Sequence, residues 1–351
     1  MSARRVEVSG APLDGPRHEI ARGAAGYPSR LEELLDPPER LYVIGEPDAL
    51  ELPTLAIIGA RRATPYGLAC ARLAARCAAD LGLAVASGAA VGCDQAGQRE
   101  ALARGARVVA VLGGGADVVY PRSAADMLAG IVARGGAVVS LQGWGAPPTR
   151  WSFVRRNAVI SGLARALVIC EAGLPSGTFS TAEVADQAGR EVLVFPGSFF
   201  SPNSRGSNFL LSQSGFLPLW DREALEESLC VIYGRLRHPP ASPGMPAGLP
   251  NAGGDNPGNP ERPAGARATP WRGEPGLTRR ERDALAALEA CPARPEALAR
   301  ALGVDVVGAM RVLGGLDARG LVSRLVDGRY SASEGALLGR EAPGAQERGA
   351  T

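Results

Sequence analysis

The chain has 351 residues, of which 46% are hydrophobic, and its formal net charge is +2. This length and apolar content allow one sizeable core and a smaller unit, and the small net charge excludes a protein that is basic over its whole surface, so any nucleic-acid site must be a local patch. All 38 cationic side chains are arginines, which excludes a Schiff-base lysine and the phosphate-binding lysine of Walker-type and kinase sites.

Short β-rich runs alternate with helical patterns over residues 51–237, after an N-terminal extension of residues 1–50. Such alternation predicts an α/β fold, an extended Rossmann-like parallel sheet with helices on both faces. The expected strands are Leu55–Gly59, Leu83–Ser87, Arg107–Leu112, Ala137–Leu141, Ala166–Cys170 and Glu191–Phe195. The expected helices are Pro65–Leu81, Asp94–Ala103, Ser123–Arg134, Phe153–Leu163 and Gly177–Ala188. A further helix, Phe209–Ser214, and strand, Phe216–Leu219, carry apolar side chains that either pack inside or form a dimer face.

Residues 238–276 are crowded with Pro, Gly, Asn and Ala, the composition of a disordered linker. After it, residues 277–333 predict a small winged helix-turn-helix domain, followed by a flexible tail over residues 334–351. Its helices are expected at Arg279–Ala290, Pro295–Leu302 and Val306–Arg319, and its hairpin strands at Leu321–Leu325 and Gly328–Ala332, around an Asp327-Gly328 turn. The third helix offers only Arg311 and Arg319 as cations, which favours a protein-contact or vestigial role over duplex reading.

Several predicted strands run directly into small or glycine-containing turns, at Gly59-Ala60-Arg61, from Ser87 to Asp94, and from Gly113 to Asp117. In a parallel sheet these turns gather at the carboxyl edge, where ligands bind. None of these turns contains the GxGxxG motif of dinucleotide-binding sites. Each glycine can equally be present because the backbone conformation of the turn requires it, and not because a ligand binds there.

Two helix starts carry the chemistry that nucleic acid needs. Phe153 offers a ring face for an unpaired base, beside the paired guanidinium groups of Arg155 and Arg156. The small residues of the second helix start let a phosphate approach backbone N–H groups. The alternative is that Phe153 is core and the arginines are solvated. The candidate binding residues are Arg61, Arg62, Ser87, Gly88, Arg150, Phe153, Arg155, Arg156, Asn157, Ser176, Gly177 and Thr178.

The remaining composition predicts a cytoplasmic protein without a cofactor or metal. His18 and His238 lie outside the apolar block, which argues against a histidine triad or a histidine-rich metal site there. The six cysteines form no CxxC pair and are expected to be buried free thiols. Neither a secretory signal pattern nor a run of about 18 apolar residues is found, so no membrane span is expected.

In the order and spacing of its short blocks, the chain resembles the DNA-processing protein A family, also called Smf. The blocks include Tyr27-Pro28-Ser29-Arg30-Leu31, Ile58-Gly59-Ala60-Arg61, Tyr120-Pro121, Phe153 to Asn157, Ser176-Gly177-Thr178 and Ser204-Arg205-Gly206. The resemblance implies a non-enzymatic protein of natural transformation that binds single-stranded DNA, forms a homodimer and helps to load a RecA-type recombinase. By motif position, Arg61, Arg150 and Phe153 would line the DNA pocket, and Arg156 and Asn157 would shape it.

The chain departs from the family pattern at several positions. Family members often carry Lys where Arg150 stands, usually a second Arg where Ala158 stands, and Ser-Glu where the chain has Ser140-Leu141. The change at Arg150 keeps the charge but alters the geometry of a phosphate contact. The changes at Ala158 and Leu141 indicate either weaker DNA binding or a diverged paralogue.

Two other functions use the same superfold. The chain also resembles the cytokinin-activating nucleotide hydrolases, but Thr181 stands where their signature has Glu, and Glu183 comes two residues late. An N-glycosidase needs that carboxylate at the sugar, which disfavours an enzyme. A nucleotide-binding sensor would use the same Arg and Gly residues as a DNA-binding protein, with a closed pocket in place of an open groove.

Overall fold

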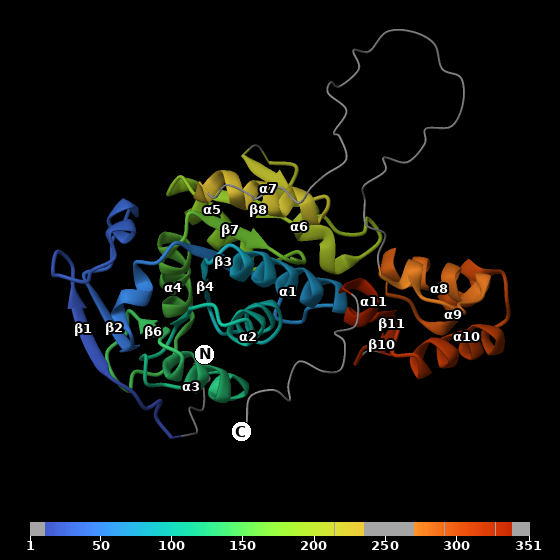
Figure 1. Ribbon diagram of the computed structural model, residues 1–351, viewed down its shortest axis with the longest axis horizontal. Coiled ribbons are helices and arrows are strands. Elements are labelled where there is room, and N and C mark those ends of the chain that lie inside the picture. The colour runs from blue at the N-terminus through green and yellow to red at the C-terminus, as the bar shows by residue number, and fades with distance from the viewer. Residues whose placement is uncertain (1–10, 214, 235–269, 291, 327, 339–351) are drawn as a thin grey trace, which may run out of the picture.

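The computed structural model describes residues 11–213, 215–234, 270–290, 292–326 and 328–338 (Figure 1). Most of the predicted linker, the end of the predicted tail, His238, Cys291 and Asp327 lie outside these residues. The strands are β1 (Arg17–Ala21), β2 (Arg40–Gly45), β3 (Thr54–Ile58), β4 (Ala84–Ser87), β5 (Val108–Leu112), β6 (Ala137–Ser140), β7 (Ala166–Ile169), β8 (Glu191–Val194), β9 (Phe216–Pro218), β10 (Val322–Arg324) and β11 (Tyr330–Ala332). The α-helices are α1 (Pro65–Asp80), α2 (Cys93–Ala103), α3 (Ala125–Ala133), α4 (Arg150–Leu163), α5 (Thr178–Gln187), α6 (Arg205–Leu210), α7 (Arg222–Tyr233), α8 (Arg279–Ala290), α9 (Pro295–Leu302), α10 (Val306–Ala318) and α11 (Glu334–Leu338).

A nine-stranded sheet in the order β1-β2-β6-β5-β4-β3-β7-β8-β9 forms the centre of the fold. From β6 to β9 all neighbours are parallel, whereas β1 and β2 add an antiparallel edge. The predicted α/β class and the seven predicted strands of the 51–237 region are confirmed, each strand to within one residue at its ends. The sequence analysis did not expect β1 and β2, which lie in its N-terminal extension.

Helices cover both faces of the sheet, because buried strand residues alternate between two cores. Along β3, Leu55 and Ile57 pack with α1, α2, α3 and α7, while Ala56 and Ile58 pack with α4, α5, α6 and a 3-10 helix at Ser29–Glu33. The five cysteines within the described residues are buried free thiols, as predicted. One helix was misplaced: the apolar pattern predicted Phe209–Ser214, but the helix is α6, which continues the 3-10 turn Pro202–Ser204.

The C-terminal part contains three helices and a hairpin in the predicted order, α8, α9, α10, β10 and β11, around a separate core. Thr278 caps α8, because its hydroxyl accepts the N–H of Glu281 at 3.2 Å while the Glu281 carboxylate accepts the Thr278 N–H at 2.8 Å. This unit lies beside α1 (Figure 1), where Arg72 Nε donates to Glu334 Oε2 of α11 at 2.5 Å.

The strand order reverses at β3. From β3 the chain passes through α1 to β4 on one side, and β7, reached after α4, pairs with β3 on the other side. In open parallel sheets the crevice at such a switch point, outside the carboxyl ends of the strands, is where ligands bind.

Candidate nucleic-acid interface

A cleft of about 600 Å³ opens at this switch point. Three segments form its walls: the turn after β3, the first three turns of α4, and the loop from β7 into α5. Segments about a hundred residues apart in sequence therefore meet at one site. The sequence-predicted residues that line it are Arg61, Arg62, Phe153, Arg156, Asn157, Ser176, Gly177 and Thr178.

Phe153 is half-buried and held in a fixed place on the wall of the cleft. Helix α4 begins with a capping box, in which Thr149 Oγ1 accepts the Ser152 N–H at 3.1 Å and Ser152 Oγ accepts the Thr149 N–H at 2.9 Å. One residue later, the Phe153 ring lies over Gly113, where a Cβ atom would come within 2.7 Å of Cδ1. Gly113 is thus required so that the ring can lie against the end of β5.

Two guanidinium groups flank this ring. The guanidinium carbons of Arg61 and Arg156 lie 5.5 and 5.7 Å from the Phe153 ring centroid, within the range of cation–π attraction. Tyr120 adds a tilted ring contact at 6.0 Å. The aromatic ring and two of the predicted cations therefore converge at one point of the cleft.

Arg156 is the most constrained cation of the site. It is 5% exposed, and its Nε–H has no hydrogen-bond partner among the residues that the structure describes. Burial is the main cause that lowers the pKa of Arg156 to about 10; Asp94 opposes this shift, and the nearby Arg61 adds to it. Because Arg156 lines the cleft, its guanidinium is a site for an incoming anion, and Arg matches the geometry of a phosphate group.

Asp94, in the first turn of α2, also lines the cleft and was not among the predicted site residues. Its Oδ2 accepts the N–H groups of Gly88 at 3.2 Å and Ala90 at 3.4 Å. Burial raises the pKa of Asp94, while Arg156 and these two hydrogen bonds lower it. Its position in the sequence, at the end of the Ser87–Asp94 turn and at the start of a predicted helix, could have identified it. A carboxylate at a helix start commonly accepts hydrogen bonds from nearby backbone N–H groups.

Ser87 and Gly88 lie beneath the cleft and do not line it. Ser87 Oγ donates to the backbone oxygen of Ile57 at 2.5 Å and is fully buried. A Cβ atom at position 88 would come within 1.2 Å of Arg156 Nη1. Gly88 is therefore needed because the guanidinium occupies the space that a side chain would take.

On the opposite wall, Ser176, Gly177 and Thr178 open α5. Ser176 Oγ accepts the Thr178 N–H at 3.2 Å and donates to Thr178 Oγ1 at 2.9 Å. A Cβ atom at Gly177 would meet nothing within 4 Å, so this helix start faces open space. The Ser176 hydroxyl thus occupies the Thr178 N–H, and Gly177, the N-cap residue, has no side chain to cap the helix. The N–H groups of such a helix start attract a phosphate.

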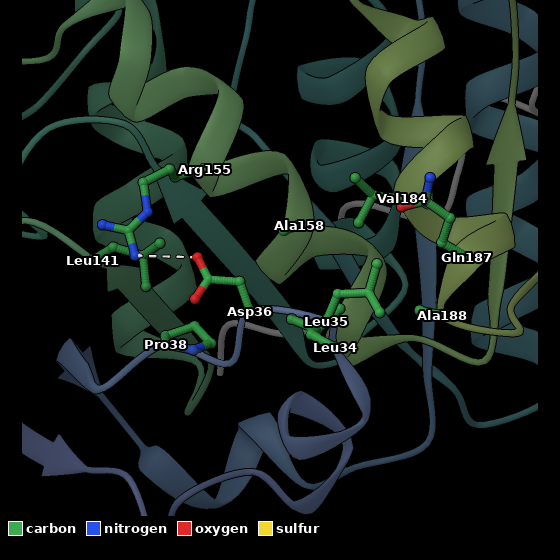
Figure 2. A pocket seen from close by; sticks show the side chains of 10 residues that line it. All are labelled: Leu34, Leu35, Asp36, Pro38, Leu141, Arg155, Ala158, Val184, Gln187 and Ala188. Carbon is green, nitrogen blue, oxygen red and sulfur yellow. Dashed lines mark ion pairs between the residues drawn. The ribbon is translucent and has the colours of Figure 1, made fainter.

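The structure places the two remaining predicted arginines elsewhere. Arg150 is exposed at the first position of α4, outside the residues that line the cleft. Arg155 lies on the other side of α4, where Nη2 is 3.9 Å from Asp36 Oδ2 (Figure 2). Arg155 lines a separate pocket of about 130 Å³, and the two family departures, Leu141 and Ala158, line it too.

Comparisons with known proteins agree with this geometry. The profile of the family described as DNA recombination-mediator protein A matches residues 18–226. Protein Smf of Escherichia coli is 36% identical over 224 residues, which are 64% of this chain and 60% of that protein. DNA processing protein DprA of Streptococcus pneumoniae is 33% identical over 201 residues, 57% of this chain and 71% of that protein. The chain thus spans about 60% of the length of the first of these relatives.

Two solved structures share the fold. The X-ray structure of DNA processing protein A from Streptococcus pneumoniae superimposes with a TM-score of 0.55 at 31% identity, over 60% of this chain and 73% of that one. The corresponding protein from Helicobacter pylori gives a TM-score of 0.57 at 27% identity, over 63% of this chain and 98% of that one. The latter structure was described for its single-stranded DNA binding mode.

Proposed function

Since the chain belongs to the DNA recombination-mediator protein A family, we propose that it binds single-stranded DNA in the switch-point cleft. The observation that carries this proposal is the pairing of Arg156 with Phe153 on the cleft wall, where the guanidinium carbon lies 5.7 Å from the ring centroid. A ring for a base and a donor for a phosphate, side by side, are the two elements of sequence-tolerant single-strand binding.

Each wall of the cleft has its own part in binding. Arg61 and Arg62 are exposed and have no ion-pair partner within the described residues, so they attract the phosphate backbone. Phe153 stacks on one base, and Arg156 binds the phosphate next to it. The start of α5 receives a further phosphate. The contacts proposed here are to phosphates and to the face of a base and not to base edges, so binding is expected to be independent of sequence.

A nucleotide hydrolase is less well supported. Of the described residues that line the cleft, Asp94 is the one carboxylate, and its oxygen already accepts two backbone N–H groups. Glu183, the acid nearest to the hydrolase signature, is exposed on α5 and does not line the cleft. We therefore propose a binding protein and not an enzyme. A nucleotide-binding sensor would bind a mononucleotide as tightly as a strand, which the experiment below tests.

The protein partners follow from the family. Recombination mediation requires a RecA-type recombinase, and we propose that the chain delivers bound single strands to one, as expected for a cytoplasmic protein of natural transformation. The edge strand β9, with exposed Leu217 and the adjacent exposed Trp220, supports a homodimer. Among the described residues, no helix is both long and apolar enough to cross a bilayer.

Fluorescence anisotropy with an unstructured labelled oligonucleotide tests the function. The matched pair is Arg156→Gln and Arg155→Gln, since the same charge is lost from neighbouring residues on opposite sides of α4. We expect Arg61→Glu, Phe153→Ala and Arg156→Gln to weaken binding by about tenfold or more, and Arg155→Gln by about twofold at most. Arg150→Glu measures whether the start of α4 extends the site.

Two outcomes would contradict the proposal. One is wild-type affinity that does not fall with salt, because phosphate contacts release counterions. The other is equal affinity of the Arg155 and Arg156 variants at unchanged melting temperature. Competition by a mononucleotide at the same concentration as the oligonucleotide would favour the sensor.

A further inference from the structure

Two phenylalanines are fully presented to solvent on the loop between β8 and α6. Phe199 is 85% exposed and Phe200 78%, and their rings form an edge-to-face pair with centroids 5.4 Å apart. Adjacent exposed rings of this size are uncommon on a surface that has no partner, because burying each would be favourable.

A structured turn holds the pair outward. Ser198 O accepts the Ser201 N–H at 3.0 Å, so the two phenylalanines take the central positions of a β-turn. Ser198 Oγ also accepts the Phe200 N–H at 3.3 Å. The base of the loop is fixed by Asn208, whose side chain both donates to Gly197 O and accepts the Gly197 N–H, each at 3.0 Å. The rings are thus exposed on an ordered turn and not on a frayed segment.

The turn stands at the end of the proposed DNA cleft. β8 is the neighbour of β7, so the loop leaves the same carboxyl edge of the sheet. Asn203, three residues after Phe200, itself lines the cleft, as does Gly173 of the β7–α5 loop. A Cβ atom on Gly173 would lie 3.6 Å from Pro202 O, which shows that the two loops are in contact. Phe199 and Phe200 therefore lie on a loop that borders the cleft at Asn203.

The charge around the turn suits a polyanion. No Asp or Glu occurs between Glu191 and Asp221, and Arg205, exposed at the start of α6, has no ion-pair partner in the described part of the chain. The loop itself is thus free of acidic residues, although Glu171 and Glu289 line a pocket beside Ser198 and Ser201. On the loop, Arg205 attracts phosphate and the two rings are the main contact for a strand. Stacking on a base is sequence-tolerant, since every base has a π face.

We propose that Phe199 and Phe200 form a second stacking platform, which binds the bases of a single strand where it leaves the cleft. This inference rests on the proposed function, and it makes a separate prediction: the contribution of the pair depends on strand length. A short oligonucleotide that fills only the cleft does not reach the turn, whereas a longer one does.

The experiment compares oligothymidylates of about 6 and about 16 nucleotides, within the range of single-strand site sizes. For the double variant Phe199→Ala/Phe200→Ala we expect affinity for the longer strand to fall about five- to tenfold, the loss of roughly one stacked base, and affinity for the shorter one to stay within about twofold. Phe199→Leu/Phe200→Leu keeps an apolar surface without rings and should show the same loss. Phe199→Tyr/Phe200→Tyr keeps the rings and should bind like the wild type.

The outcomes separate this inference from the proposed function. A wild type that binds neither strand would overturn both. Wild-type binding that the Ala variant reduces equally for both lengths, or that the Leu variant retains, would overturn the second platform and leave the cleft standing. Sedimentation of each variant without DNA is the control, because a change of mass would assign the pair to contact between copies of this chain and would also overturn the proposal.

Discussion

Arg155 and Arg156 are neighbours in sequence, yet they face opposite sides of α4, one toward Asp36 and the other into the cleft. The residue types at the helix start predicted that an arginine of this pair lines a ligand cleft, and Arg156 does so. They could not decide which arginine faces it, because that depends on the helix phase relative to the sheet. Asp94 was missed for a different reason: an acidic residue is not expected in an anion site until its hydrogen bonds to Gly88 and Ala90 are seen.

Gly88→Ala tests how far the site depends on the position of Arg156. The new Cβ would overlap Arg156 Nη1, so the guanidinium must move. We expect single-strand affinity to fall about tenfold, the loss of one charged hydrogen bond, with unfolding free energy changed by about 1 kcal/mol. Gly314→Ala, on α10 with open space around it, is the control in anisotropy and urea unfolding. Unchanged affinity in Gly88→Ala would show that Arg156 takes no part in binding.

Glu171 predicts a pH dependence of stability. Burial raises its pKa above the ordinary 4.5, although the Thr64 N–H and hydroxyl, both at 2.7 Å, lower it. Above the pKa of Glu171 in the folded state, the buried carboxylate is charged and lowers the free energy of unfolding. As the pH falls through that pKa toward 4.5, the folded state binds a proton before the unfolded state does, and the free energy of unfolding rises. The wild type should therefore gain unfolding free energy relative to Glu171→Gln as pH falls from about 7.5 to about 5. Urea unfolding measures this, and Glu183→Gln, at an exposed position, is the control.

At the scale of elements, the inner parallel strands β3 to β7 could be predicted because each is a short, fully buried and largely apolar run between helical patterns. β1 and β2 could not. They join the sheet antiparallel and without a connecting α-helix, and β1 exposes three of its five residues. The alternation that identified the other strands was therefore absent there. The hydrophobic pattern at residues 209–214 indicates which residues are buried, but it does not indicate where a helix begins. It therefore did not predict that α6 begins at Arg205.

The second pocket beside α4 gives a prediction about the family departures. Leu141 and Ala158 line it together with Arg155 and Asp36, so a family-like Arg at 158 and Glu at 141 would share one site. Ala158→Arg alone adds a second cation beside Arg155 and should destabilise the fold. Adding Leu141→Glu should restore roughly 0.5–1 kcal/mol beyond additivity. A double-mutant cycle by urea unfolding measures this coupling; additive values would mean that the two positions do not interact.

At the scale of the molecule, the C-terminal unit contacts the Rossmann-like part through Arg72 and Glu334. Its third helix does not present a basic face. Val306, Val307 and Met310 of α10 are exposed, and Arg319 already donates to the backbone oxygens of Pro275 and Gly276. An apolar exposed helix face is typical of a protein contact and not of a helix that lies in a major groove.

We therefore expect duplex DNA to compete poorly. With a labelled single strand bound to the full chain, an unlabelled duplex of the same length should need about tenfold or more concentration than an unlabelled single strand for half-displacement. Arg311→Glu should leave both values unchanged. Equal competition by the duplex, lost in Arg311→Glu, would assign duplex binding to α10.

The cleft at the β3–β7 switch point is assembled from segments that are distant along the chain, and this has a kinetic consequence. Its walls exist only when the pairing of β3 with β7, more than a hundred residues apart, is complete. Such non-local pairings form slowly because the loop entropy must be lost before the contacts are gained. During refolding from urea, binding of an oligonucleotide should therefore appear after the helical circular dichroism signal has recovered. The rate at which binding appears then measures the formation of the cleft, the last step of folding.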